Sequence, residues 1–215
     1  MKVKLFLFGL LLVALSMNSN AQVTFQVGAG AGYSVGAGDL PNEWVDGGYG
    51  MDGGFNIHAK ARVGLLTFIG VGEVGYTMMT HDGTTSEDDL NILSLKVGPE
   101  FHISLPLIPI DPYLGANFQV NTFSGESRTK GTPSATYEIE SAARYGIGIN
   151  GGVIFSLGGL KLDLNLGYNM LNAFGKDFEN NTGSDTFLLN DGEGDGFDAR
   201  SINTLEFKVT AMIGI

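Results

Sequence analysis

The feature that most constrains the fold is a strict alternation of apolar and polar residues at the end of the sequence. Every second residue from Leu205 to Ile215 is apolar, and Glu206, Lys208 and Thr210 lie between them. Strand side chains point alternately to opposite faces, so this segment would have one apolar face. In a soluble protein such a strand would leave an exposed apolar edge, whereas a closed barrel in lipid has no edge. The alternation therefore predicts the closing strand of a membrane-spanning β-barrel.

Seven further segments repeat this period of two. The predicted strands comprise residues 23–35, 54–64, 67–79, 90–104, 112–123, 143–155, 160–171 and 204–215. Their connections alternate between short turns and four long loops, at residues 36–53, 80–89, 124–142 and 172–200. An even strand number with this asymmetry is typical of outer-membrane barrels. We predict an all-β fold, an eight-stranded antiparallel transmembrane β-barrel with up-and-down meander topology. Pro99 cannot donate to a strand ladder, so it predicts a bulge or a local pairing defect.

The first residues have the pattern of a secretory signal. Lys2 and Lys4 precede an apolar run at residues 5–15, and small residues follow at Ser19 and Ala21. The apolar run is shorter than the roughly 20 residues that a transmembrane helix needs. We therefore expect a cleaved signal peptide at residues 1–21 and an outer-membrane β-barrel domain at residues 22–215. The sequence contains no cysteine, so the exported protein would not depend on disulfides.

The charge distribution separates loops from strands. The formal net charge is −11, or −13 without Lys2 and Lys4, which excludes a nucleic-acid binder that works by neutralising phosphates. The four predicted loops have net charges of −4, −4, −1 and −5, so the strands and turns are almost neutral. A soluble barrel would carry many charges on its outer face, yet only 16% of the residues are charged, mostly in loops. This distribution favours the membrane barrel with an acidic outer surface.

Three segments resemble a known family: the signal segment ending at Ala21, the strand entry at residues 111–116, and the terminal alternation. In these segments the sequence resembles the small eight-stranded outer-membrane barrels of the OmpA, OmpX and OmpW type, and more closely the outer-membrane β-barrel domain proteins common in Bacteroidetes. Ile215 stands where that family typically has phenylalanine. The resemblance implies location in the cell outer membrane, contact with outer-membrane lipid, insertion by the barrel assembly machinery through the C-terminal strand, and an unknown extracellular partner.

The predicted inward faces carry ten charged residues. Since an eight-stranded barrel has room only for side chains, we expect these charges to pair across the lumen as a structural plug. The alternative is a narrow, porin-like channel for small solutes. The ten residues are Lys60, Arg62, Glu73, Lys96, Glu100, Arg144, Lys161, Asp163, Glu206 and Lys208.

One triplet raises the alternative of an enzyme. His102 and Ser104 share a strand face with Glu100, and the His-x-Ser spacing resembles that of outer-membrane lipid A deacylases. A lipid-hydrolysing site must reach the outer leaflet, whereas this triplet lies next to a short turn at the predicted periplasmic end. We therefore expect no catalytic residues and a scaffold that presents its four acidic loops for surface interaction or envelope integrity.

The last long loop contains the most specific short motif. Asp191, Glu193, Asp195 and Asp198 alternate with glycines, as in the first half of a calcium loop. The closing bidentate glutamate is missing, because Ile202 occupies its place. We expect no cofactor beyond weak calcium binding at these four residues, and the alternative is a solvated acidic loop.

Overall fold

The computed structural model describes residues 23–42, 48–65, 67–82, 86–103, 110–130, 136–179, 186–187, 189–194, 196 and 198–214. The predicted signal peptide, Ser104, Asp195 and Ile215 lie outside these ranges. The described residues form nine strands: β1 (Val23–Gly38), β2 (Gly53–Leu65), β3 (Phe68–Asp82), β4 (Ser86–His102), β5 (Ile110–Thr129), β6 (Thr136–Leu157), β7 (Leu160–Phe174), β8 (Thr186–Phe187) and β9 (Ile202–Gly214). None of the described residues belongs to a helix long and apolar enough to cross a membrane.

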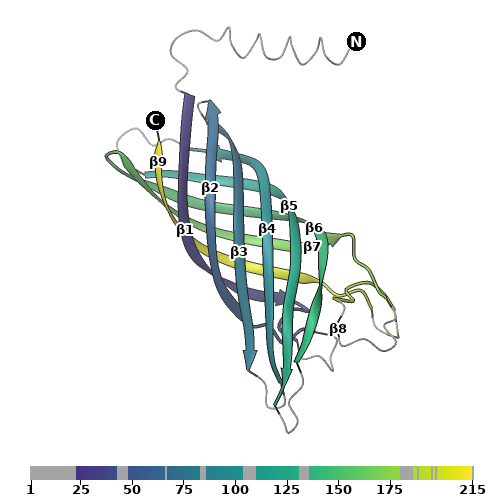
Figure 1. Ribbon diagram of the computed structural model, residues 1–215. Helices are drawn as coiled ribbons and strands as arrows, with labels where there is room; N and C mark the ends of the chain where they lie inside the picture. Colours follow the sequence, from purple (N-terminus) through teal and green to yellow (C-terminus); the bar gives the residue numbers. More distant parts are fainter. Residues whose placement is uncertain are drawn as a thin grey trace, which may run out of the picture.

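All these strands except β8 form a closed antiparallel barrel. Each barrel strand pairs with its neighbours in the sequence, and β9 closes the sheet by pairing with both β1 and β7. β2, β4 and β6 end, and β3, β5 and β7 begin, at one end of the barrel, which we call the turn end, toward the top of Figure 1. We call the opposite end the loop end. The prediction of an eight-stranded antiparallel meander barrel is confirmed.

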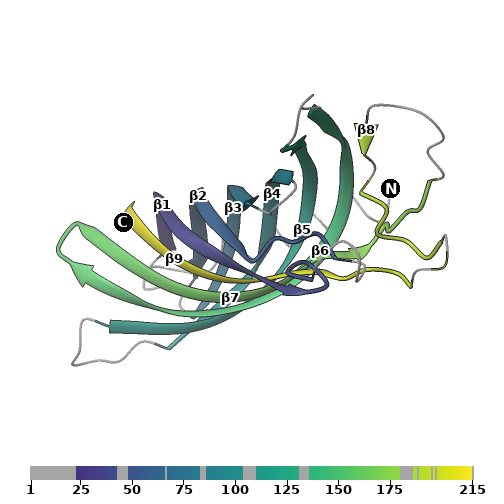
Figure 2. The ribbon, with the colours of Figure 1, turned by 90° about the horizontal axis from the view of Figure 1, so that it is seen from below.

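The strands extend further at the loop end than the sequence pattern indicated. β5 and β6 remain paired as far as Arg128 and Thr136, so most of the predicted loop at residues 124–142 is a β-hairpin. The two-residue strand β8 pairs in parallel with β6 at Glu138 and Ile139, and it lies beside the start of β6 in Figure 2. From Ser124 to Arg128, β5 has a polar residue or glycine at every position, so its sequence loses the apolar–polar alternation that indicates a strand.

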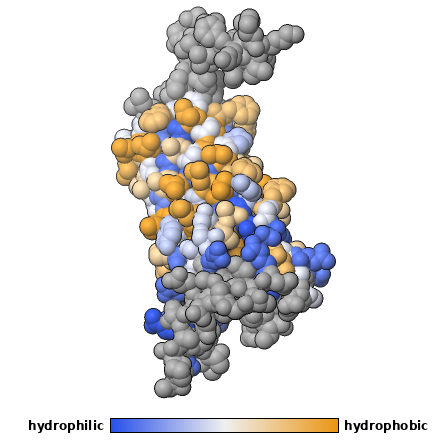
Figure 3. Space-filling model, turned by 45° about the vertical axis from the view of Figure 1, so that its right-hand side comes forward, coloured by the Kyte–Doolittle hydropathy of each residue, from blue (hydrophilic) through white to orange (hydrophobic). Residues whose placement is uncertain are grey.

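The outer face of the barrel is apolar around its whole circumference. Large apolar side chains are exposed on all eight barrel strands, among them Phe55, Leu95, Leu114 and Ile149. They cover the barrel wall in Figure 3, and hydrophilic residues gather toward the loop end. Aromatic pairs lie on this face near both ends, Phe68 with Phe101 and Tyr33 with Phe55. An outward apolar band with flanking aromatic residues is the surface of a membrane-spanning barrel.

The pairing defect expected at Pro99 is present. The ladder between β4 and β5 pairs Val97 with Phe118 and Glu100 with Gly115, and among the described residues it has no pairs at Gly98 and Pro99. The register is the same on both sides of this gap. Pro99 has no N–H to donate, so the ladder is interrupted without a shift of the strands.

The outward face of β4 allows a direct test of membrane immersion. Leu95 is 54% exposed in the middle of this strand, and Leu95→Arg would place a guanidinium among acyl chains. We expect the free energy of unfolding, measured by urea titration in lipid vesicles, to fall by about 2–4 kcal/mol. The control is Glu126→Arg on the exposed hairpin at the loop end, which should change it by less than about 0.5 kcal/mol. Equal effects of the two variants would contradict the membrane-facing assignment.

Candidate functional site

The lumen is filled by two clusters of buried ion pairs. Eight of the ten predicted inward charges belong to them, and only Arg144 and Lys161 do not. The clusters form because alternate residues of β2, β3, β4, β7 and β9 point into a barrel too narrow for anything larger than side chains.

The first, which we call the turn-end cluster, consists of Lys60, Arg62, Glu100 and Asp163. Lys60 Nζ lies 3.0 Å from Glu100 and 3.1 Å from Asp163. Arg62 donates to the same two carboxylates, with Nε 2.7 Å from Glu100 and Nη2 2.9 Å from Asp163. Two cations thus share two carboxylates, and all four side chains are buried.

Two ring systems, Tyr113 and His102, complete the turn-end cluster. Tyr113 donates its hydroxyl hydrogen to Asp163 over 2.7 Å and accepts a hydrogen bond from Asn165 over 2.8 Å. Its ring is stacked on His102, and the Arg62 guanidinium lies 4.8 Å from its centroid. The sequence analysis missed Tyr113, although its position in the inward register of β5 could have indicated it.

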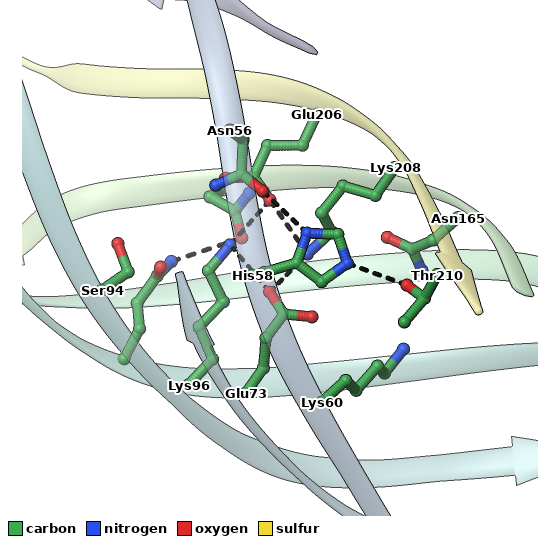
Figure 4. Close-up of polar contacts among 12 residues, drawn as sticks. Asn56, His58, Lys60, Glu73, Ser94, Lys96, Asn165, Glu206, Lys208 and Thr210 are labelled. Atoms are coloured by element: carbon green, nitrogen blue, oxygen red, sulfur yellow. Dashed lines mark hydrogen bonds and ion pairs between the residues drawn. The ribbon is translucent and has the colours of Figure 1, made fainter. Parts of the chain in front are cut away.

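The second, which we call the mid-barrel cluster, consists of Glu73, Lys96, Glu206 and Lys208. Lys208 lies 2.5 Å from Glu73 and 3.3 Å from Glu206. Lys96 lies 2.7 Å from Glu206 and 3.8 Å from Glu73, which completes a ring of alternating charge. Figure 4 shows these side chains converging from opposite walls, with His58 beside them and bonded to Thr210.

Each cluster contains two cations and two carboxylates, so each is neutral by itself. Buried charges are tolerated when they are paired and hydrogen-bonded, whereas loss of one partner leaves an uncompensated charge. A small cavity of about 30 Å³ remains beside the clusters, lined by residues of both, including Lys60, Glu100, Lys96 and Glu206. A cavity of this size has room for only one or two water molecules.

Between the mid-barrel cluster and the loop end, an apolar plug closes the lumen. Six inward strand residues meet three residues from the connections β1–β2 and β7–β9. All nine are buried: Met79, Leu90, Ile92, Phe123, Leu171 and Ile202 from the strands, with Leu40, Met51 and Leu189 from the connections. The inward strand residues turn apolar at this level, whereas those of the two ion-pair clusters are charged.

Arg144 and Asp191 hold the last long loop to this plug. Arg144 Nη2 lies 2.8 Å from Asp191 Oδ1, and its Nε donates to the same carboxylate over 2.9 Å. Asn172 donates to Asp191 Oδ2 over 2.8 Å, and the backbone N–H of Asp177 donates to Oδ1 over 3.1 Å. Asp191 is 0% exposed, so its charge is neutralised inside the protein.

The first and last loops are also bonded to each other across the mouth. Tyr49 donates its hydroxyl hydrogen to the carbonyl of Leu189 over 2.8 Å, and the Arg200 guanidinium lies 5.5 Å from the Tyr49 ring centroid. Burial, with a smaller contribution from Asp191, raises the pKa of Tyr49, so its hydroxyl stays protonated and able to donate. Asp39 accepts hydrogen bonds from the N–H and hydroxyl of Ser201. The two loops therefore form one cap.

Three groups of predicted residues have surroundings other than those expected. Arg144 pairs with Asp191 at the mouth rather than with a lumen carboxylate. Lys161 is half-buried near the turn end, and no ion pair joins it to another described residue. Among the predicted calcium ligands, Asp191 has both oxygens occupied by donors, while Glu193 and Asp198 are exposed. The described residues contain no group of three or more His, Asp or Glu that could hold a metal ion.

The residues of the enzyme alternative are engaged in structural contacts. His102 is 8% exposed, stacks on Tyr113 and lies 3.1 Å from Glu100 Oε2. Glu100 is in turn paired with both Lys60 and Arg62. A general base needs a substrate within hydrogen-bonding reach, and this histidine faces other buried side chains.

Comparisons with known proteins agree on the fold. The sequence matches no protein-family model, and no curated protein is recognisably similar in sequence. Two solved structures are similar with a TM-score of 0.57 each. Neisserial surface protein A (NspA) is 15% identical, over 89% of this chain and 98% of its own. A major outer membrane protein from Thermus thermophilus is 16% identical, over 90% of this chain and all of its own. The chain therefore has the fold of the small outer-membrane β-barrel proteins.

The turn-end cluster yields one prediction. Tyr113→Phe removes the hydrogen bond to Asp163 and leaves the Asn165 amide with only its long, 3.5 Å hydrogen bond to the Gly151 carbonyl. We expect the free energy of unfolding to fall by about 1–3 kcal/mol. Tyr145→Phe is the control, because Tyr145 is on the outer face and 48% exposed, and it should change stability by less than about 0.5 kcal/mol. A Tyr113 variant as stable as its control would show that the hydroxyl contributes nothing.

The cap yields a second prediction. In Asp191→Asn, the amide nitrogen would face the donors of Asn172 or Asp177, and Arg144 would remain as an unpaired buried cation. We expect a loss of about 3–5 kcal/mol in unfolding free energy. The backbone N–H of Arg200, which donates to the Asp191 carbonyl, should exchange faster with deuterium. The control Glu193→Gln makes the same change of charge at an exposed position, and equal exchange in both variants would contradict a structural role for Asp191.

Proposed function

We propose that this protein is a non-enzymatic outer-membrane scaffold whose loop end is its interacting surface. The observation that carries the proposal is the double closure of the lumen, by the two neutral ion-pair clusters and by the apolar plug above them. Within the part of the chain that the structure describes, a lumen filled in this way favours a scaffold over a channel or an enzyme. The part that faces the outside is then the part available for function.

The geometry of the loop end supports this role. The ends of β4, β5 and β6 project as a paired sheet beyond the apolar band, and they carry charges of both signs, such as Glu126 and Arg128. The cap beside this sheet is held together by internal hydrogen bonds, so the outer surface of the cap rests on an ordered part of the structure. Outward from the buried Asp191, the exposed carboxylates of Glu193 and Asp198 remain available to a cationic partner. The chemistry of the surface therefore favours partners with positive charge or bridging divalent ions.

Location in the outer membrane can be tested independently of the function. The tagged protein should fractionate with outer membranes and resist carbonate extraction. An unboiled sample should migrate differently from a boiled one on a detergent gel, because a closed barrel resists unfolding by detergent. Recovery in the soluble fraction, with identical migration of the two samples, would overturn the membrane assignment.

Conductance distinguishes the scaffold from the channel alternative. In planar bilayers we expect no current steps above background from the wild-type protein. Asp191→Asn should also be silent, because loosening the cap leaves both ion-pair clusters in the lumen. Steps from the wild type would overturn the scaffold proposal in favour of a channel. Steps from the variant alone would show that the cap is the only barrier and that the clusters do not close the lumen.

A further inference from the structure

The two sides of the lumen differ in chemistry. β2, β3, β4 and β9 contribute most of the paired charges, while β5, β6 and β7 form what we call the amide wall. Its inward side chains are mainly carboxamides, and glycines lie opposite them on the neighbouring strands. The residues are Asn117, Gln119, Asn150, Asn165 and Asn169, with Gly115, Gly146, Gly148, Gly152 and Gly167.

The register explains this alternation. Asn117 and Asn169 are both paired with Gly148, so two amides meet above a residue without a side chain. A Cβ at Gly148 would lie 2.4 Å from Asn169 Oδ1 and 2.9 Å from Asn117 Nδ2. In the next row the order is inverted, because Asn150 lies between Gly115 and Gly167. Glycine at position 148 is what makes room for the amides of Asn117 and Asn169.

The amide wall has hydrogen-bonding capacity that the protein does not use. The charged groups of the opposite wall satisfy one another in the two clusters. On the amide wall, by contrast, Asn117 Oδ1, Gln119 Oε1 and Asn169 Nδ2 are buried without a partner among the described residues. Asn169 is only 2% exposed. Each such atom destabilises the fold unless water or another group reaches it.

The cavity of about 30 Å³ lies beside two of these three residues. Asn117 and Asn169 line it on one side, and Lys96, Glu206 and Lys208 line it on the other. It also borders the ladder gap at Pro99. One water molecule needs roughly 10–15 Å³ of cavity volume, so the cavity has room for about two water molecules. The three lysines and three glutamates that line it balance, so there is no net charge to hold an ion.

We propose that this cavity is an internal water site. About two water molecules hydrogen-bond to Asn117 and Asn169 and connect the amide wall to the mid-barrel cluster. The apolar plug lies toward one end of the lumen and the turn-end cluster toward the other, and both would slow the exchange of these waters with bulk solvent. Water thus completes the hydrogen bonding of the lumen where the side chains alone do not.

Nuclear magnetic resonance of the refolded protein in micelles can detect such water directly. We expect nuclear Overhauser cross-peaks between the water signal and the side-chain amide of Asn169. The sign of these peaks should be that of water bound for longer than the protein takes to tumble. The control is the side-chain amide of Asn172, which is equally buried but donates to Asp191 and to the Arg200 carbonyl. Absence of peaks at Asn169, or equal peaks at Asn172, would overturn the proposal.

A cavity-filling variant provides the second test. In Gly167→Ala the new methyl would have only ordinary contacts, the nearest at 3.6 Å from Asn150 Cβ and the Ile149 carbonyl oxygen, so it fits and takes space from the water. The matched control is Gly72→Ala on the outer face, where a Cβ meets nothing within 4 Å. Relative to this control, Gly167→Ala should lower the folding equilibrium constant about tenfold and weaken the water peaks of Asn169. A gain in stability would show that the cavity is dry, and unchanged peaks would show that the detected water lies elsewhere.

Discussion

Charges that strands turn into an eight-stranded barrel must be neutralised there, because the lumen excludes bulk water and lies within a hydrocarbon layer. Lys96 of β4 and Glu206 of β9 meet across the lumen, although they are 110 residues apart in the sequence. A one-residue slip of either strand would turn its charges toward lipid and its apolar residues inward. The two clusters therefore stabilise the register of the entire barrel, beyond any contribution that a single pair makes to stability.

Several of the chain's 33 glycines have a structural use in the same lumen. A narrow barrel cannot place a large side chain at every inward position, and the amide wall solves this by alternating carboxamides with glycine across three strands. This packing leaves a small polar void instead of a solid core. The mid-section of the barrel is consequently held by hydrogen bonds and ion pairs, whereas the loop end is held by apolar contacts among residues such as Phe123 and Leu189.

The cap changes the interpretation of the acidic loops. Four acidic segments around an open mouth would repel one another, with only partial screening at physiological salt. Asp191 is instead withdrawn from that surface and neutralised by Arg144, and Asp39 accepts hydrogen bonds from Ser201. Part of the acidic residues thus stabilises the loops, and part, including Glu193 and Asp198, remains exposed to solvent. Only the exposed part is available to a partner.

The sequence by itself determined the barrel, its strand number and the face on which each charge lies, because alternation with period two is a local property of a chain. It also indicated the defect at Pro99. The partners of each charge, the hydrogen bonds of Tyr113, the apolar plug and the pairing of Arg144 with Asp191 were decided by the tertiary structure. These contacts join strands that are distant in sequence, and their alignment depends on how the closed sheet is staggered around the barrel axis. No local pattern records that stagger, so the sequence could identify the residues of the lumen but not which of them meet.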